Sequence, residues 1–183
     1  VAFPEMGKQG KAKPKKDTPV AADELLVNGG FEQLDDKGLV SSWNVSGGEY
    51  DENLQVYTED PHGGKNGVWL YHNKPMYLSQ AVTRIIPGET YKLTAFIKGQ
   101  TAASPAMKVE WSGYDESGNY KNYDGVNKYY AVSGEWAEVT LEVTAPEKAG
   151  RAVIMIRLLG EGSVYFDDVS FRGKLGEEVI PDP

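Results

Sequence analysis

The stretch SVYFDDVSF, residues 163–171, has the composition of a buried β-strand but carries two aspartates at its centre. Val, Tyr and Phe favour strands, whereas Asp is depleted in them because its short side chain competes for the backbone. Side chains alternate along a strand, so every second residue from Tyr165 to Phe171 shares one face, and Asp167 lies in it. Since this face is the more apolar of the two, we expect Asp167 to point toward a core. An unpaired carboxylate is costly there, so something must stabilise Asp167.

Similar segments of alternating or continuous apolar character follow one another along the chain, separated by turn sequences rich in Gly and Pro. They are LLVNGGFE (25–32), LQVYTED (54–60), GVWLYHN (67–73), MYLSQAVTRI (76–85), TYKLTAFIKG (90–99), AMKVEWSGYD (106–115), WAEVTLEVTAP (136–146) and AVIMIRLLG (152–160). Almost nothing has helical periodicity. We therefore predict an all-β fold, an antiparallel β-sandwich of the jelly-roll type.

Composition limits the classes of partner. The chain of 183 residues has a formal net charge of −8 and contains no cysteine. An acidic chain argues against nucleic acid and anionic membrane surfaces as partners, and no apolar run is long enough to cross a membrane. The lack of cysteine excludes disulfides, thiolate metal sites and cysteine nucleophiles, but it does not exclude export from the cell.

The length fits one domain with a tail at each end. Residues 1–22 mix Gly, Pro, Lys and Ala without periodicity, which predicts a linker or disordered arm. Residues 23–173 form the predicted domain, and residues 174–183 form a predicted C-terminal linker. No signal peptide is visible and the chain begins with Val1, which fits a mature or excised fragment of a longer polypeptide.

The order of the segments resembles that of a known group of modules. The likeness is carried, in order, by LLVNGGFE (25–32), SSWNV (41–45), LSQAVTRIIPGETYKLTAFIKG (78–99), GEWAEVTLEVTAP (134–146) and VYFDDVSF (164–171). This set is similar to the carbohydrate-binding modules of families four, nine, sixteen and twenty-two. The resemblance covers most of the chain and implies a jelly roll that binds sugars without catalysing a reaction.

The resemblance also implies a structural calcium ion at one edge of the sandwich, which would explain Asp167. The implied ligands are the carboxylates of Glu32 and Asp167 and the backbone carbonyls of Gly30 and Lys65. Calcium takes about six to eight oxygens, and glycine-rich turns can aim carbonyls inward. In the alternative, Asp167 accepts hydrogen bonds from the N-terminal strand or pairs with an arginine. Asp168 faces the other way and is expected to be solvated.

Sugar binding requires aromatic faces and planar polar side chains. Trp43 follows NGGFE at a distance that resembles the family-sixteen pattern, in which the corresponding tryptophan lines the cleft. Its neighbours Ser42 and Asn44 are polar, which argues against burial on both sides. The alternative is a tryptophan of the core or of a sheet edge. Gln80 recurs in the same position in these modules, where it is either structural or sugar-facing.

Two strands carry the remaining candidates for sugar binding. Arg157 interrupts the apolar segment 152–160, so it must reach water, a partner or a ligand. Glu110, Ser112 and Tyr114 lie on the polar face of segment 106–115. If the two strands share a concave sheet, Arg157 and Glu110 either contact sugar hydroxyls or form a structural ion pair.

The sequence contains few patterns that are typical of catalytic sites. The only histidines, His62 and His72, have neither metal-ligand nor triad spacing. A pair of carboxylates facing each other across a cleft could still occur among 27 acidic residues, which leaves a small jelly-roll hydrolase or lyase as an alternative. A second alternative is a calcium-stabilised interaction or spacer module of a cell-surface protein that does not bind sugar.

We therefore expect a non-catalytic carbohydrate-binding module whose ligand is a polysaccharide or oligosaccharide. The module would target a covalently linked, secreted polysaccharide-degrading enzyme to a β-linked glycan of the glucan, mannan or xylan type. Its expected location is secreted or extracellular, or attached to a cell surface.

Overall fold

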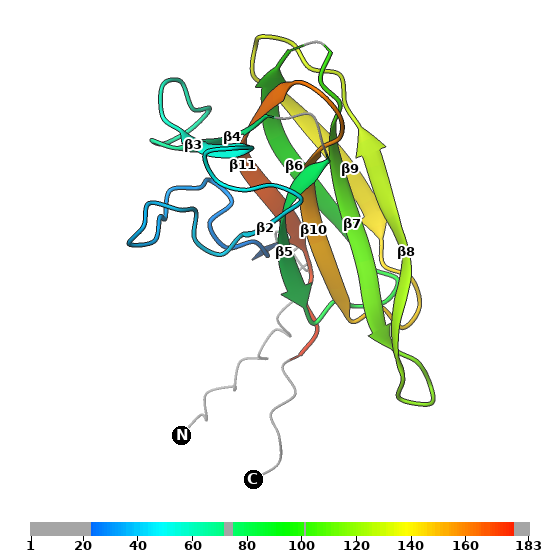
Figure 1. Ribbon diagram of the computed structural model, residues 1–183. Coiled ribbons are helices and arrows are strands. Elements are labelled where there is room, and N and C mark those ends of the chain that lie inside the picture. The colour runs from blue at the N-terminus through cyan, green and yellow to red at the C-terminus, as the bar shows by residue number, and fades with distance from the viewer. Residues whose placement is uncertain (1–22, 72–74, 101, 178–183) are drawn as a thin grey trace, which may run out of the picture.

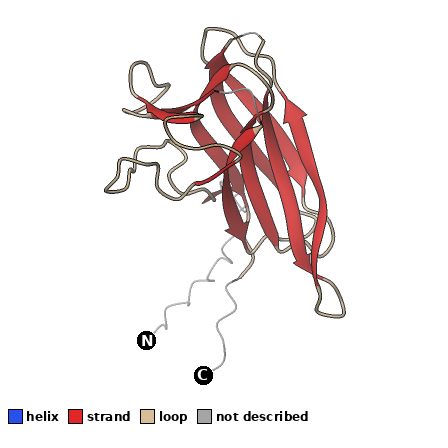
Figure 2. Cartoon of the chain, viewed as in Figure 1, coloured by secondary structure: helices blue, strands red, loops and turns tan. Residues whose placement is uncertain are grey.

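The computed structural model describes residues 23–71, 75–100 and 102–177, which form two antiparallel sheets packed face to face (Figure 1, Figure 2). The strands are β1 (Asp23–Glu24), β2 (Asn44–Ser46), β3 (Leu54–Tyr57), β4 (Gly67–Tyr71), β5 (Met76–Thr83), β6 (Thr90–Gly99), β7 (Pro105–Tyr114), β8 (Tyr120–Tyr129), β9 (Ala137–Thr144), β10 (Arg151–Leu158) and β11 (Ser163–Gly173). The six-stranded sheet has the order β3-β4-β11-β6-β9, with β1 paired to β11, and the five-stranded sheet has the order β2-β5-β10-β7-β8. The predicted all-β antiparallel sandwich is confirmed. The described part of the chain contains no helix long and apolar enough to span a membrane.

The core lies between the sheets and follows from the alternation of side chains. Every second residue from Tyr91 to Ile97 of β6 is buried, as is every second residue from Ala152 to Leu158 of β10. Burial of these opposed apolar side chains is the main stabilising contribution. Each sheet also has an outward side. We call them the β10 face, which holds Arg157 of the central strand, and the β11 face, which holds Tyr165 and Asp167.

Strand β11 contains a bulge at the two aspartates. Its register with β6 shifts between Asp167 and Ser170, and Asp168 has a positive φ of 46°. The extra residue allows Phe166 before the bulge and Phe171 after it to face the same core. Simple alternation predicted that Asp167 shares a face with Phe171, and that prediction is wrong.

Asp167 nevertheless is fully buried, with 0% of its surface exposed. It lies opposite Phe96 of β6 on the β11 face, where the loop of residues 58–66 covers it. His62 of this loop stacks on the Phe96 ring at 3.5 Å between centroids, and the N–H of Gly63 donates a hydrogen bond to Asp167. A loop, rather than the core between the sheets, therefore encloses this carboxylate.

The two ends of the described domain meet. Asp23 of β1 lies opposite Gly173 of β11. The chain continues to pack beyond β11, because Leu175 forms a β-bridge with Ile85 and the Tyr91 hydroxyl donates to the carbonyl of Lys174. Residues 174–176, which were predicted to belong to the C-terminal linker, therefore pack on the described domain. The predicted arm 1–22 and the last residues, 178–183, lie outside the described residues.

Candidate functional site

The β10 face presents a row of residues that crosses four strands. The register aligns, in order, Tyr77 of β5, Arg157 of β10, Ala106 of β7 and Tyr129 of β8. Tyr77 and Arg157 are half-buried, and Tyr129 is 61% exposed. Side chains directly opposite each other on antiparallel strands are in contact range. The row therefore places a guanidinium group and a methyl group between two phenol rings.

Arg157 is held at one end of its guanidinium group only. Its Nη1 donates a 2.7 Å hydrogen bond to the Oδ1 atom of Asn127. Its Nε is buried and has no hydrogen-bond partner among the residues that the structure describes. An ion pair between Arg157 and Glu110 is absent from the same residues, because Glu110 pairs with Lys108 of its own strand. The alternative of a structural Arg157–Glu110 pair is therefore wrong, and Arg157 Nε is a buried donor without a partner in the described residues.

The rest of the face is polar and hollowed. A cavity of about 310 Å³ lies beside the Lys108–Glu110 pair and is bordered on β8 by Asn122, Tyr123 and Asp124. Lys108 offsets Glu110, and Asp124 leaves the polar walls of this cavity with a net negative charge.

Ser112 and Tyr114 lie farther along the same face of β7. Ser112 is buried and accepts a 2.6 Å hydrogen bond from the Tyr120 hydroxyl. Tyr114 is 67% exposed and meets Tyr120 edge-on at 5.5 Å between ring centroids. The structure thus brings Glu110, Ser112, Tyr114 and Arg157 onto one sheet surface, as their strands predicted.

Trp43 does not belong to this surface. Only 7% of the side chain is exposed, its ring packs on Phe31 at 5.6 Å, and its Nε1 donates to the carbonyl of Asn28. The prediction of an exposed stacking platform at Trp43 is wrong, because the positive φ of Ser42 turns the chain and directs the indole inward. Trp43 is a core tryptophan, which was the alternative.

Gln80 also has a structural arrangement. Its side-chain oxygen accepts from the N–H of Val27, and its Nε2 donates to the carbonyls of Val27 and Ser42. These three bonds fasten the N-terminal segment to β5 and use the amide almost completely. Gln80 therefore has little hydrogen-bonding capacity left for a sugar.

The predicted metal ligands gather around the glycine-rich loop after β3. The exposed carboxylate of Glu32 accepts hydrogen bonds of 2.9 and 3.0 Å from the N–H groups of Lys65 and Asn66. Gly64 has a φ of 60°, and a Cβ added there would lie 2.2 Å from Glu32 Oε1. Glycine is thus needed for both the backbone conformation and the close approach. Lys65 was predicted to offer its carbonyl to a metal ion. In the structure its N–H group donates to the Glu32 carboxylate.

The two aspartates reach the same loop. Asp167 accepts from the N–H groups of Gly63 and Asp168, at 3.0 and 2.7 Å. Burial raises the pKa of Asp167 to about 6, although these hydrogen bonds lower it. Asp168, which was expected to be solvated, lies 2.6 Å from His62 Nδ1, and its carboxylate also approaches the predicted ligand Gly30. Three carboxylates therefore surround one short loop.

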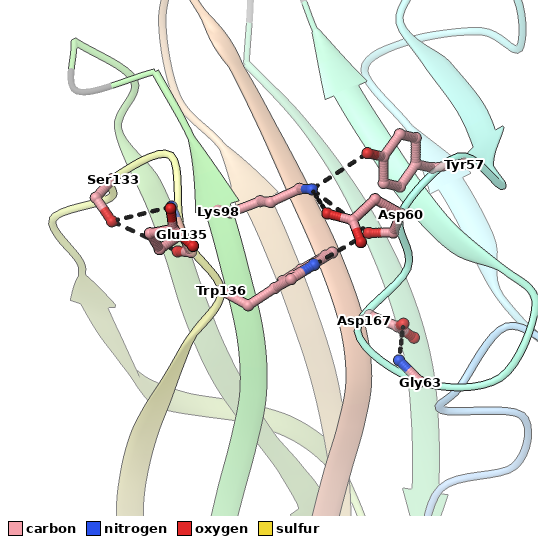
Figure 3. Close-up of polar contacts among 8 residues, drawn as sticks. All are labelled: Tyr57, Asp60, Gly63, Lys98, Ser133, Glu135, Trp136 and Asp167. Atoms are coloured by element: carbon pink, nitrogen blue, oxygen red, sulfur yellow. Dashed lines mark hydrogen bonds and ion pairs between the residues drawn. The ribbon is translucent and has the colours of Figure 1, made fainter.

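A second group of side chains covers the β11 face, and we call it the Lys98 cluster: Tyr57, Asp60, Lys98, Trp136 and Tyr165 (Figure 3 labels all but Tyr165). Lys98 Nζ lies 5.1, 4.9 and 5.2 Å from the ring centroids of Tyr57, Trp136 and Tyr165. It donates to the hydroxyl of Tyr57 and to both the carbonyl and the carboxylate of Asp60. Burial lowers the pKa of Lys98, but the bonds to Asp60 and Tyr57 more than offset this, so the pKa is raised. Lys98 is thus a charged, fully bonded residue within an aromatic cage.

Comparison with known proteins identifies the family. Residues 23–160 match the model of the family described as carbohydrate binding domain, which joins modules of families four and nine. The chain belongs to this family. The module therefore shares a fold and a sugar-binding character with a group that the sequence already resembled. No curated protein sequence matches it.

Solved structures resemble the module in fold at low sequence identity. The complex of a family 61 module with beta-1,4-galactotriose has a TM-score of 0.57 and 24% identity, and covers 83% of this chain and 100% of that one. The family 22 xylan-binding domain from Paenibacillus barcinonensis has a TM-score of 0.58 and 18% identity, and covers 83% of this chain and 95% of that one. The enzymatically active domain of tailspike protein 4 from bacteriophage CBA120 has a TM-score of 0.61 and 17% identity. This chain spans only 21% of that protein, although 81% of this chain is covered.

The module has surface aromatic residues that the sequence reasoning missed. Trp69 and Trp136 were not among the predicted site residues, and both are only half-buried on the β11 face. One signal was available, since Trp69 and Tyr165 each lie between two buried apolar residues of their strands, and Tyr57 follows Val56, which packs against the core. The sequence lacked the pairing order that brings β3, β4 and β11 together.

Proposed function

We propose that the module binds a neutral β-linked glycan, of the glucan, mannan or xylan type, across its β10 face. The observation that carries this proposal is the arrangement of Arg157, which is half-buried on this face, is held by Asn127 through Nη1 and shares its cross-strand row with Tyr77 and Tyr129. A planar donor bordered by aromatic rings suits a sugar, since hydroxyl groups accept hydrogen bonds and the C–H surface packs on phenol rings.

The polar groups along the face extend this surface for a chain rather than a single sugar. Asn127 fixes Arg157, and the Lys108–Glu110 pair with its 310 Å³ cavity lies one row farther along the strands. Asp124 borders this cavity beside the neutral pair, so its walls carry a net negative charge, which favours a neutral ligand over a polyuronate. The family 61 and family 22 relatives are described as complexed with a β-1,4-galactan fragment and as xylan-binding, which supports this class of ligand.

Binding would hold a covalently linked, secreted polysaccharide-degrading enzyme close to its substrate. Tethering raises the effective concentration of substrate without chemistry in the module itself.

The test is calorimetric titration with xylohexaose, cellohexaose and mannohexaose, before and after the change Arg157→Met. We expect one of these sugars to bind and the variant to bind at least about tenfold more weakly, since a desolvated charge-assisted donor is lost. Lys92→Met, which removes an exposed cation from the opposite sheet, is the matched control and should not affect affinity. Equal affinity of the Arg157 variant and the control would contradict the proposal.

We further propose that a structural calcium ion binds beside the loop of residues 62–66. Calcium prefers carboxylate and carbonyl oxygens, and Glu32, Asp167 and Asp168 supply carboxylates around this loop. No cluster of three metal-binding side chains is found in the described part of the chain, so backbone carbonyls such as that of Gly30 would complete the shell. A bound cation would also remove the cost of burying Asp167.

Thermal unfolding with EDTA tests the calcium proposal. The melting temperature should fall on chelation and recover with calcium but poorly with magnesium, which requires a smaller octahedral shell. Asp167→Ala should show no response to calcium. A melting temperature that is the same in EDTA and in calcium would reject the ion.

A further inference from the structure

The β11 face is hollowed beside the Lys98 cluster. Two hollows of about 350 Å³ each share Tyr57, Trp69 and Tyr165 along their common border. One extends past Lys98 to Gly134, and the other extends toward Glu59. Each volume lies at the small end of the range for ligand sites, roughly 300–1,000 Å³.

Flat aromatic surfaces form the base of these hollows. Trp69 and Tyr165, which lie opposite each other on β4 and β11, are stacked with an angle of 12° between their ring planes. Tyr57 reaches across Gly67, its own partner on β4, to within 4.3 Å of the Tyr165 ring centroid. The three rings remain half-buried, so part of their surface is open. A side chain at Gly67 would press on β11, because an added Cβ would lie 3.1 Å from the carbonyl oxygen of Phe166 and 3.5 Å from the Asp167 side chain.

The charges at this place favour a neutral ligand. The three N–H groups of Lys98 are directed to Tyr57 and Asp60, so its charge is matched by a carboxylate and its donors are occupied. Glu59 borders the second hollow, and no basic side chain of the described residues lines that hollow. An anionic ligand would meet no free positive charge here, whereas hydroxyl groups can bond to Gln55, Gln100 and Ser163 at the edges.

We propose that these two hollows form a second carbohydrate site, which takes one or two neutral sugar residues stacked on Trp69 and Tyr165. The site lies on the opposite side of the sandwich from the β10 face and shares no residue with it. One module can therefore hold two separate glycan segments, which increases avidity for a dense polysaccharide surface.

Nuclear magnetic resonance of ¹⁵N-labelled protein tests the second site directly. The indole N–H signal of Trp69 is followed during titration with xylotriose, cellotriose, mannotriose and β-1,4-galactotriose, after assignment with Trp69→Phe. We expect this signal to move with at least one trisaccharide, both in the wild type and in Arg157→Met. Because Arg157→Met impairs only the β10 face, failure of the first proposal would not imitate failure of the second.

Two variants should block the β11 face. Gly134→Gln fills the first hollow without a clash, since nothing lies within 4 Å of a Cβ at Gly134, and Tyr165→Leu removes a stacking ring but keeps apolar volume. Each should weaken the response of Trp69 by about tenfold or more, which is typical of losing an aromatic anchor. Gly150→Gln, at a glycine with equally open surroundings, is the control and should leave the response unchanged. An indole signal that no trisaccharide moves, or one that both blocking variants leave unaltered, would overturn the site.

Discussion

In the absence of divalent cations, the free energy of unfolding should depend on pH through Asp167. The side chain is 0% exposed, and burial raises its pKa from 3.8 to about 6 against the opposing hydrogen bonds from Gly63 and Asp168. The folded state therefore holds this proton more tightly than the unfolded state. The stabilisation is complete below about pH 4 and is lost as the pH rises through 6. Raising the pKa of Asp167 from 3.8 to about 6 changes the free energy of unfolding by roughly 3 kcal/mol, since one pKa unit is worth about 1.4 kcal/mol.

The assay is urea unfolding in EDTA between pH 3.5 and 7.5, with wild type and Asp167→Asn compared at each pH. Other carboxylates titrate in both proteins, so the difference between the two free energies isolates Asp167. The wild type should lose roughly 3 kcal/mol relative to the variant as the pH rises, with most of the loss between about pH 4 and 6. Asp36→Asn, at an exposed position, is the control for the loss of a carboxylate on the surface. A constant difference for Asp167→Asn, or one of the opposite sign, would refute the reasoning.

Three further predictions concern stability and can all be measured by urea or thermal unfolding. Trp43→Ala should lower the free energy of unfolding by about 3–5 kcal/mol, since a buried indole is lost, and the folded variant should keep its glycan affinity. The reverse pattern would return Trp43 to the sugar site. Ending the chain after Glu177 should leave the melting temperature unchanged, whereas ending it after Gly173 should lower it because packed residues are removed; equal melting would show that the predicted linker limit was right. Gly29→Ala should cost more than about 2 kcal/mol, because the new Cβ would lie 1.9 Å from a carbonyl oxygen of β11, and a neutral effect would show that the strand can move.

The sandwich could be predicted from the sequence because apolar and polar residues alternate almost regularly along its strands. Segment 90–99 illustrates this, since it forms β6 with its expected apolar side buried. The same rule failed in β11, where one extra residue at Asp168 reverses the faces. A bulge depends on the fit with neighbouring strands, and nothing in the letters of SVYFDDVSF marks it.

The candidate sites were predicted in part. Arg157 and Glu110 could be assigned to a sheet surface from the sequence. Arg157 interrupts an apolar segment, and Glu110 lies on the polar side of an alternating one. Trp43 misled because polar neighbours were taken as a sign of exposure, whereas the turn at Ser42 directs the indole inward. The Lys98 cluster draws its residues from three strands and two loops, so only the strand order shows that they meet.

The pairing of β1 with β11 also determines how the molecule should respond to mechanical tension. Asp23 and Gly173 lie opposite each other, so the chain enters and leaves the described domain at adjoining points. A pull on both ends would open the few backbone hydrogen bonds of this pair one after another, instead of shearing many at once. Such an edge opens locally at a free energy well below that of global unfolding. Under tension applied at its two ends, the module should therefore lengthen first at β1 and keep both outer faces intact.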